Sequence, residues 1–308
     1  MDPLCHTLVA GCLGQSGLKR RTGLGMATLV IAANLPDLDI LAIFAGRNLE
    51  FRRGWTHGVL AILVWPFLLA GLLWLWDRLR PRPDRAPVRL EALLLLSAIG
   101  VLTHPFLDFL NNYGMRWLMP FRDRWYYGDT LVIVDLWLWG SLAAGIWLAR
   151  LRERAGRPDP GRPARLVLAV ATAYIGLMMM STIAARADVG RQLGAPFRFM
   201  VAPVFLTPFA KQVVVDEGAT YRIGHYRWGN SPSLRFDLSL PKGGDSVAAA
   251  AISKSRSGRA FLHWARFPVF REERRGDSVV IRVHDLRYVD DRGESWAAVE
   301  ATMPARVP

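Results

Sequence analysis

The chain has 308 residues, enough for one large domain or two ordinary ones, and 52% of them are hydrophobic. Its formal net charge of +13 could indicate nucleic-acid binding, but much of the arginine lies in short loops between apolar runs. Arginine placed in this way is typical of membrane proteins, so we expect no nucleic-acid partner. The chain has two cysteines, Cys5 and Cys12, and they indicate neither a disulfide framework nor a cysteine-based zinc site.

Apolar runs follow one another through the first 190 residues. Two of them contain 20 residues with no acid, Lys or Arg, the length that crosses a bilayer. Two others carry acids, and two more are weaker because one is short and the other holds two Asp residues. The expected spans are 57–76, 90–112, 131–149 and 166–185, with weaker ones at 4–18 and 24–45. A signal peptide is not expected, because Asp2 is acidic and the first basic cluster follows the first apolar run.

Arginine counts in the loops predict the orientation. Loops 77–89 and 150–165 hold five and six Arg, whereas loops 46–56 and 113–130 hold three each. Arginine-rich loops stay in the cytoplasm. The N-terminus and everything after about residue 186 are then expected outside it.

From about residue 212 the pattern changes. The stretch "SLRFDLSL" (233–240) alternates apolar and polar residues with a period of two, as a half-buried strand does. Further short β-branched or aromatic segments are "QVVVDE", "TYRIGHYRW", "AFLHWARFPVF", "SVVIRVHDL" and "SWAAVEAT". The proline-containing stretch 195–209 before them is expected to be an extended connector.

These patterns predict an α-helical polytopic membrane domain, with about four to six membrane helices, followed by a small antiparallel β domain. The expected division is a membrane-embedded helical metal-site domain at 1–190, a connector at 191–211 and a soluble β domain at 212–308.

Seven polar residues fall near the outer face when each run is taken as a helix rising about 1.5 Å per residue. They are His6, Asp37, Asp39, His57, His104, Asp108 and Asp135. A charged side chain in the hydrocarbon costs about 2.5–3.5 kcal/mol, so intramembrane acids are candidates for function. For each residue alone, a capping acid or a buried hydrogen-bonded pair is the alternative.

His and Asp without Cys form a ligand set for Zn²⁺, Mn²⁺ or a similar divalent ion. The stretch "HPFLD" places His104 and Asp108 four residues apart, on one face of a helix. Pro36 is expected to end the preceding helix, which lets Asp37 and Asp39 converge in a turn. The sequence therefore predicts a metal pocket built from several helices.

Five stretches, in this order along residues 1–140, resemble bacterial inner-membrane metal-dependent hydrolases of the YdjM type. They are "MDPLCHTLVAG", "NLPDLDIL", "RRGWTHGVL", "LTHPFLDFLNNYG" and "PFRDRWYYGDTLVIVD". The resemblance implies a metal-dependent hydrolase, distantly similar to zinc-dependent phospholipase C and P1-type nucleases. The metal-site residues that it implies are His6, Asp37, Asp39, His57, His104 and Asp108.

Two positions differ from the family pattern. Arg52 stands where the family often has His, and Gly58 where it often has Ser. One possible ligand is therefore missing, and the number of metal ions stays open. Asp37 and Asp39 are the expected catalytic residues, each as ligand or as base.

The expected function is hydrolysis of an ester, a phosphoester in a membrane lipid or lipid-linked substrate, at the outer boundary of the bacterial inner membrane. The expected cofactor is a divalent metal, Zn or Mn. The candidates for holding the substrate are Arg52, Arg53, Arg116, Arg122, Arg124 and Asp135, with headgroup contact as the alternative for the arginines. An ion-coupled transporter and a non-enzymatic anchor that presents the β domain are the rival functions, and no protein partner is predicted.

Overall fold

The computed structural model describes residues 1–80, 86–289 and 295–304, and it divides into two compact units. The first, here called the membrane unit, contains Met1–Ile40, Arg53–Ala184 and Ala202–Pro208. The second, here called the C-terminal unit, contains Leu41–Arg52, Ala185–Val201 and Phe209–Pro308. Arg82 and Arg85, two of the arginines on which the predicted orientation depends, lie outside the described residues.

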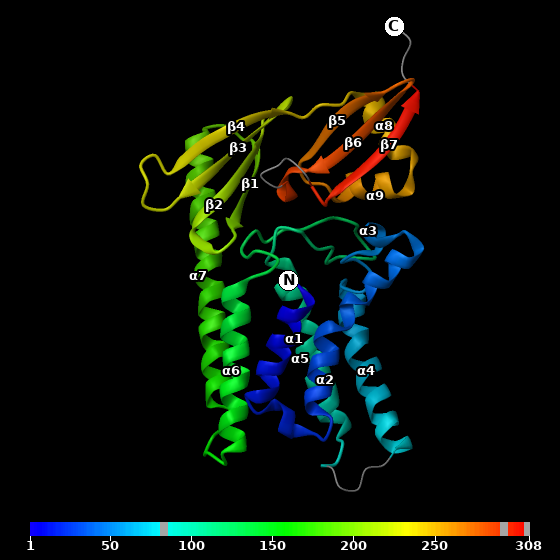
Figure 1. The fold of residues 1–308 in the computed structure, drawn as a ribbon. Coiled ribbons are helices and arrows are strands. Elements are labelled where there is room, and N and C mark those ends of the chain that lie inside the picture. The colour runs from blue at the N-terminus through cyan, green and yellow to red at the C-terminus, as the bar shows by residue number, and fades with distance from the viewer. Residues whose placement is uncertain (81–85, 290–294, 305–308) are drawn as a thin grey trace. The chain divides into compact units, whose positions relative to one another are not determined.

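The membrane unit is a bundle of helices with α5 near its centre (Figure 1). Helix α5 packs against α1, α2 and α4, and α1 also packs against α6. The helices are α1 (Pro3–Gln15), α2 (Gly25–Asn34), α4 (Val59–Leu79), α5 (Leu90–Phe109), α6 (Leu136–Arg154) and α7 (Arg162–Leu193), the last of which continues into the C-terminal unit. Small residues allow the closest approach, since a Cβ on Gly100 of α5 would lie 2.5 Å from the Cβ of Ala32 on α2.

Four stretches of the described chain are long and apolar enough to cross a membrane: Gly25–Ala45, Val59–Leu79, Leu90–Phe109 and Arg162–Leu193. Large apolar side chains project from them, including Phe67, which is 67% exposed, and Ile183, which is 62% exposed. Exposed apolar surfaces of this kind are typical of helices that contact lipid. A helical membrane region followed by a small antiparallel β region confirms the predicted fold class.

Two predicted spans are not among these four stretches. The expected span 131–149 is helix α6, shifted to Leu136–Arg154, and its last five residues include three Arg and one Glu. The expected segment 4–18 is α1, whose 13 residues extend only about 20 Å. Helix α6 is not a candidate span because of the charged residues at its end, and α1 is not one because it is too short.

α-Helical bonding stops at Asn34, just before Pro36, and the chain continues as a 3₁₀ helix over Leu35–Ala45. The predicted helix end at this proline is therefore confirmed, but the turn expected after it is replaced by a 3₁₀ helix. In the 3₁₀ pattern the carbonyl of Ala33 would accept from the N–H of residue 36, which a proline lacks. The Ala33 carbonyl can therefore accept a hydrogen bond from another element.

Three basic turns of the membrane unit meet at one end of the bundle. Lys19 Nζ lies 2.5 Å from Glu153 Oε2 at the end of α6, and Arg165 of α7 donates to the carbonyl of Ser16 at 3.0 Å. Arg89, just before α5, donates to the carbonyl of Arg21. These contacts place the arginine-rich ends of α5, α6 and α7 together.

Two antiparallel sheets, in the orders β1-β2-β3-β4 and β5-β6-β7, belong to the C-terminal unit except for Ala202–Pro208 at the β1–β2 hairpin. The last turns of α7 pack on the first sheet through a core that includes Ala185, Val189, Val213 and Tyr226. Two short helices, α8 (Ser246–Lys254) and α9 (Arg256–Trp264), pack against β7, and α3 (Asn48–Phe51) packs against α9. The strands are β1 (Arg198–Val204), β2 (Thr207–Asp216), β3 (Thr220–Arg227), β4 (Leu234–Pro241), β5 (Pro268–Arg275), β6 (Ser278–Asp285) and β7 (Ala298–Pro304).

The strand prediction for "AFLHWARFPVF" is wrong in its first half. Residues up to Trp264 belong to α9, which the Ser255 side chain caps by accepting from the Gly258 N–H. Gly258, Phe261 and Trp264 are buried at a spacing of three residues, so a single helix face packs inward. Residues 191–211, treated above as a connector, contain the end of α7, strand β1 and the start of β2. The edge position of β1 accommodates its Pro203.

We expect Gly100→Val to lower the free energy of unfolding by about 1–3 kcal/mol, because the added side chain overpacks the contact between α2 and α5. The matched control is Gly176→Val in α7, where an added Cβ meets nothing within 4 Å. Thermal unfolding of both variants in detergent tests the difference. Equal stability of the two variants would contradict the close packing.

Candidate metal centre

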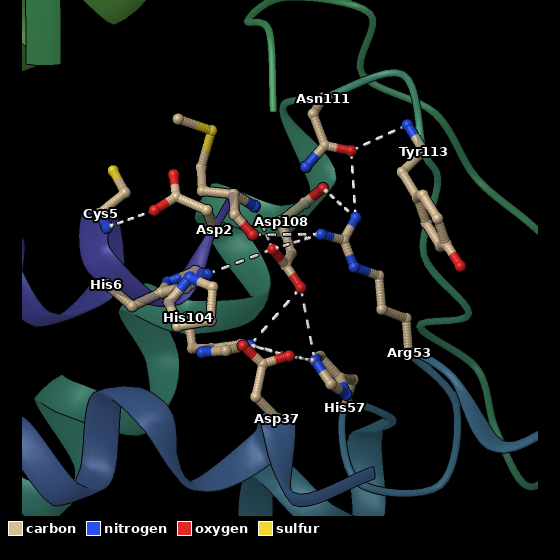
Figure 2. Close-up of polar contacts among 12 residues, drawn as sticks. Asp2, Cys5, His6, Asp37, Arg53, His57, His104, Asp108, Asn111 and Tyr113 are labelled. Carbon is tan, nitrogen blue, oxygen red and sulfur yellow. Dashed lines mark hydrogen bonds and ion pairs between the residues drawn. The ribbon is translucent and has the colours of Figure 1, made fainter. Parts of the chain in front are cut away.

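Four side chains from three separate stretches meet at the end of the bundle that contains the C-terminal half of α5 (Figure 2). They are Asp37 of the 3₁₀ helix, His57 just before α4, and His104 and Asp108 of α5. One donor atom from each lies within 4.8 Å of all the others. His57, His104 and Asp108 are fully buried, and only the side chain of Asp37 is partly exposed, at 13%.

Contacts at Nδ1 hold each histidine with Nε2 directed inward. His104 Nδ1 lies 2.6 Å from the carbonyl of Ala33, which can only accept, so Nδ1 carries the proton. His57 Nδ1 lies 2.9 Å from Thr56 Oγ1 and 3.4 Å from the carboxylate of Asp39. In the neutral rings both Nε2 atoms are then acceptors.

These two Nε2 atoms face each other at 3.0 Å. Asp108 Oδ2 lies 3.4 Å from that of His57 and 3.5 Å from that of His104, and no residue in the described part of the chain donates a hydrogen bond to it. Asp37 Oδ1 lies 3.9 and 3.8 Å from the same two nitrogens. Several atoms that can accept hydrogen bonds or bind a metal ion thus converge on one point.

A divalent cation fits this arrangement. Ligand atoms at about 2.0–2.1 Å from a tetrahedral ion lie about 3.3 Å apart, and the donor separations above bracket that value. Two imidazoles and a carboxylate suit Zn²⁺ and related ions. The residues present can therefore hold a divalent ion of the kind that the sequence predicts.

Arg53 compensates and orients the buried carboxylates. Its guanidinium lies 2.9 Å from Asp108 Oδ1 and 3.0 Å from the Asn111 side chain, over the Tyr113 ring. Its backbone N–H donates to Asp39 Oδ2 at 2.7 Å. The φ angle of +50° lets the backbone and the side chain of this residue serve two different acids.

His6 and Asp39, both predicted as ligands, lie beside the group of four. The His6 ring stacks on His104 with centroids 3.8 Å apart, and its Nε2 lies 3.3 Å from Asp108 Oδ1, an oxygen that the Met1 amino group also contacts. Asp39 contacts His57 Nδ1 and the Arg53 N–H as described above. His6 and Asp39 thus lie next to the four metal-binding residues, and Asp39 orients His57.

Several of the residues predicted to hold substrate have other contacts here. Arg53 is buried against Asp108. Arg116 is 2% exposed, with Nη1 3.0 Å from Asp123 and its guanidinium over the Trp125 ring. Asp135 caps α6 by accepting from Trp137 and Leu138 N–H groups, and it also accepts from the Tyr174 hydroxyl. Arg122 is exposed.

Two structural partners of the site, Asn111 and the Ala33 carbonyl, were not predicted from the sequence. Asn111 follows Asp108 by three residues and binds Arg53, but an Asn in "FLNNYG" is also typical of a turn. The Ala33 carbonyl cannot be recognised from residue type at all. Its availability could have been inferred from Pro36.

The chain belongs to the YdjM inner membrane protein family. The family matches residues 1–185, which include every residue of the centre described above. The chain is also similar to the uncharacterized protein YfhP of Bacillus subtilis (strain 168), with 24% identity over 273 residues, covering 85% of this chain and 77% of that protein. That match is longer than the family region, so it extends into the C-terminal unit.

No solved structure matches the chain. The distant similarity to zinc-dependent phospholipase C and P1-type nucleases therefore stays a prediction. Family membership and the apolar helices identify a membrane protein of an inner-membrane family with a group of residues that can bind a metal ion.

We expect Asp39→Asn to weaken metal binding about 10–100-fold, the usual effect of losing a partner that orients a metal-binding histidine. Calorimetric titration with Zn²⁺ or Mn²⁺ measures the change. Asp135→Asn is the matched control, because Asn caps a helix as well as Asp does and Asp135 caps α6. Metal binding that falls equally in both variants would contradict the role of Asp39.

Proposed function

We propose that the protein is a membrane-bound, metal-dependent hydrolase that cleaves a phosphoester in a lipid or lipid-linked substrate. The observation that supports it best is the convergence of His57 Nε2, His104 Nε2 and Asp108 Oδ2 on one point. Three protein ligands with a further position open are typical of catalytic metal sites. Family membership and the partial exposure of Asp37 at the open side agree with this use.

We assign each residue a role. His57, His104 and Asp108 would hold the ion, which supplies Lewis-acid activation of water and of the scissile group when bound. Asp37 is the one member of the group that is partly exposed, so we assign its carboxylate to take the proton from the attacking water. Asp39 keeps the proton of His57 on Nδ1, and Arg53 offsets the charge of Asp108.

The surroundings of Asp37 favour a lipid substrate. Large apolar side chains within three residues of Asp37, His57 or His104 along the chain are exposed. They are Leu38 and Ile40 at 45% each, Trp55 at 54% and Phe106 at 48%. A water-soluble phosphoester would gain nothing from such neighbours. An acyl or isoprenoid chain would lie against them while its head reaches the carboxylate.

The basic end of the bundle supports an outward-facing centre. The arginine-rich ends of α5, α6 and α7 meet at one end, and Asp108 lies about 27 Å along α5 from residue 90. With the basic end in the cytoplasm, the centre lies near the opposite face. We therefore propose that the site faces the periplasmic side of the inner membrane. Helix α7 begins at the basic end and continues into the C-terminal unit, so we propose the same side for that unit.

We expect purified protein to bind about one divalent ion per chain and to hydrolyse a phospholipid or a lipid-linked phosphoester. His104→Ala and Asp108→Asn should lose the ion and more than about 100-fold of the activity, because a direct ligand matters more than its orienting partners. Elemental analysis and phosphate-release assays on the same samples measure both effects.

The matched control for these variants is Glu153→Gln, at the basic end of the bundle. Hydrolysis that survives either substitution would contradict the proposal. Metal-dependent ion flux into proteoliposomes without hydrolysis would support the transporter instead, and protein that binds no metal would support the anchor.

We expect alkaline phosphatase fused after residue 304 to be active, because that enzyme folds only outside the cytoplasm. The physical reason is that arginine-rich loops resist translocation. A fusion within the arginine-rich loop 150–165 is the control and should be inactive. Inverse activities of the two fusions would place the centre at the cytoplasmic face.

A further inference from the structure

The segment Leu41–Arg52 connects two parts of the metal centre but belongs to the C-terminal unit. Asp37 and Asp39 come just before it, and Arg53 and His57 follow it, all in the membrane unit. We call Leu41–Arg52 the joining segment. Because the chain is continuous, whatever fixes the joining segment also restrains the residues at both of its ends.

One carboxylate, Glu50, links the joining segment to α9. Arg256, the first residue of α9, contacts it with two nitrogens, Nε at 2.7 Å from Oε2 and Nη2 at 2.9 Å from Oε1. Arg47 contacts the same carboxylate at 3.1 and 2.7 Å. The hydrogen bonds from Arg47, and then those from Arg256, lower the pKa of Glu50 to about 2, so it stays charged at any physiological pH.

Apolar packing between the joining segment and α9 is incomplete. A cavity of about 280 Å³ lies beside the ion pair, lined by Ile43, Leu49, Phe261 and Val299 among others. Ile43 is 54% exposed and the neighbouring Phe44 is 87% exposed. The bidentate contact of Arg256 with Glu50, which Arg47 also contacts, is therefore the interaction that fixes the joining segment against α9.

Arg53, the residue directly after the joining segment, contacts two acids of the centre. Its N–H lies 2.7 Å from Asp39 Oδ2, and its guanidinium lies 2.9 Å from Asp108 Oδ1. A shift of Arg52 moves the backbone of Arg53 directly. Asp39 in turn contacts His57 Nδ1, so the shift reaches a predicted metal ligand.

We propose that Glu50 and Arg256 are positioning residues through which the C-terminal unit sets the geometry of the metal centre. The proposal rests on the metal binding assumed in the proposed function, but it does not depend on which reaction the centre catalyses. The C-terminal unit then acts on the centre through the chain that connects the two units, and α9 is the element that holds this chain.

The test is a double-mutant cycle on metal affinity in the full chain, with Glu50→Gln, Arg256→Gln and the two together. Each single variant should bind Mn²⁺ or Zn²⁺ about fivefold more weakly, the largest effect expected from losing a surface ion pair. The double variant should be no weaker than Glu50→Gln, because the two changes remove the same contact. Arg256→Lys keeps the charge but loses the bidentate contact, and it should fall between wild type and Arg256→Gln.

Two controls separate positioning from general stability. Glu217→Gln removes an ion pair with Arg222 of similar length, 2.7 Å, within the C-terminal unit but outside the joining segment, and its metal affinity should stay unchanged. Amide hydrogen exchange at residues 53–57 should be faster in Arg256→Gln than in Glu217→Gln. This second readout needs no bound metal.

Unchanged metal affinity and unchanged exchange at residues 53–57 in Arg256→Gln would overturn the proposal, as would an equal loss in Glu217→Gln. The proposed function fails by a different result, which is metal binding without hydrolysis in wild type. Each failure can therefore be recognised without the other.

Discussion

The centre depends on two imidazole nitrogens that face each other as acceptors. His57 Nε2 and His104 Nε2 lie 3.0 Å apart, and the opposite nitrogen of each ring is already engaged by its surroundings. Neither ring can turn away without giving up a buried contact at Nδ1, which is costly in an apolar interior. Asp108 adds an anionic oxygen to the same point, so a cation is the simplest group that satisfies all three.

The fold produces this arrangement by helix ends rather than by long polar stretches. The absence of a side chain at Gly100 brings α2 and α5 together, and Pro36 leaves the Ala33 carbonyl available at the end of α2. His104 on α5 takes that carbonyl at 2.6 Å. Gly100 and Pro36 thus together allow the contact that keeps the proton of His104 on Nδ1.

The sequence allowed the four donors to be predicted because their signals are local. The four-residue spacing of His104 and Asp108 predicts one helix face, and the proline before Asp37 predicts a change in the backbone. The roles of the surrounding residues were harder to predict, since an arginine near an apolar run indicates a headgroup contact as readily as a buried ion pair. Arg53 became a clamp because its positive φ directs its backbone and side chain to different acids, which residue type does not reveal. Asp135 was predicted from its place in an apolar run, and the structure shows that it caps α6.

The C-terminal unit was predicted as an appendage, and its connection to the centre could not be read from the sequence. Periodicity identifies elements one at a time, whereas the membership of Leu41–Arg52 in that unit depends on contacts with α9, about 200 residues later. An insertion held in this way differs from a domain attached at one end, because both of its ends return to the same site. On our proposal, restraint of the insertion reaches Asp37 and Asp39 on one side of it and Arg53 and His57 on the other. A relative that is similar over both regions agrees with the two parts being retained together, as expected if the second contributes to the geometry of the first.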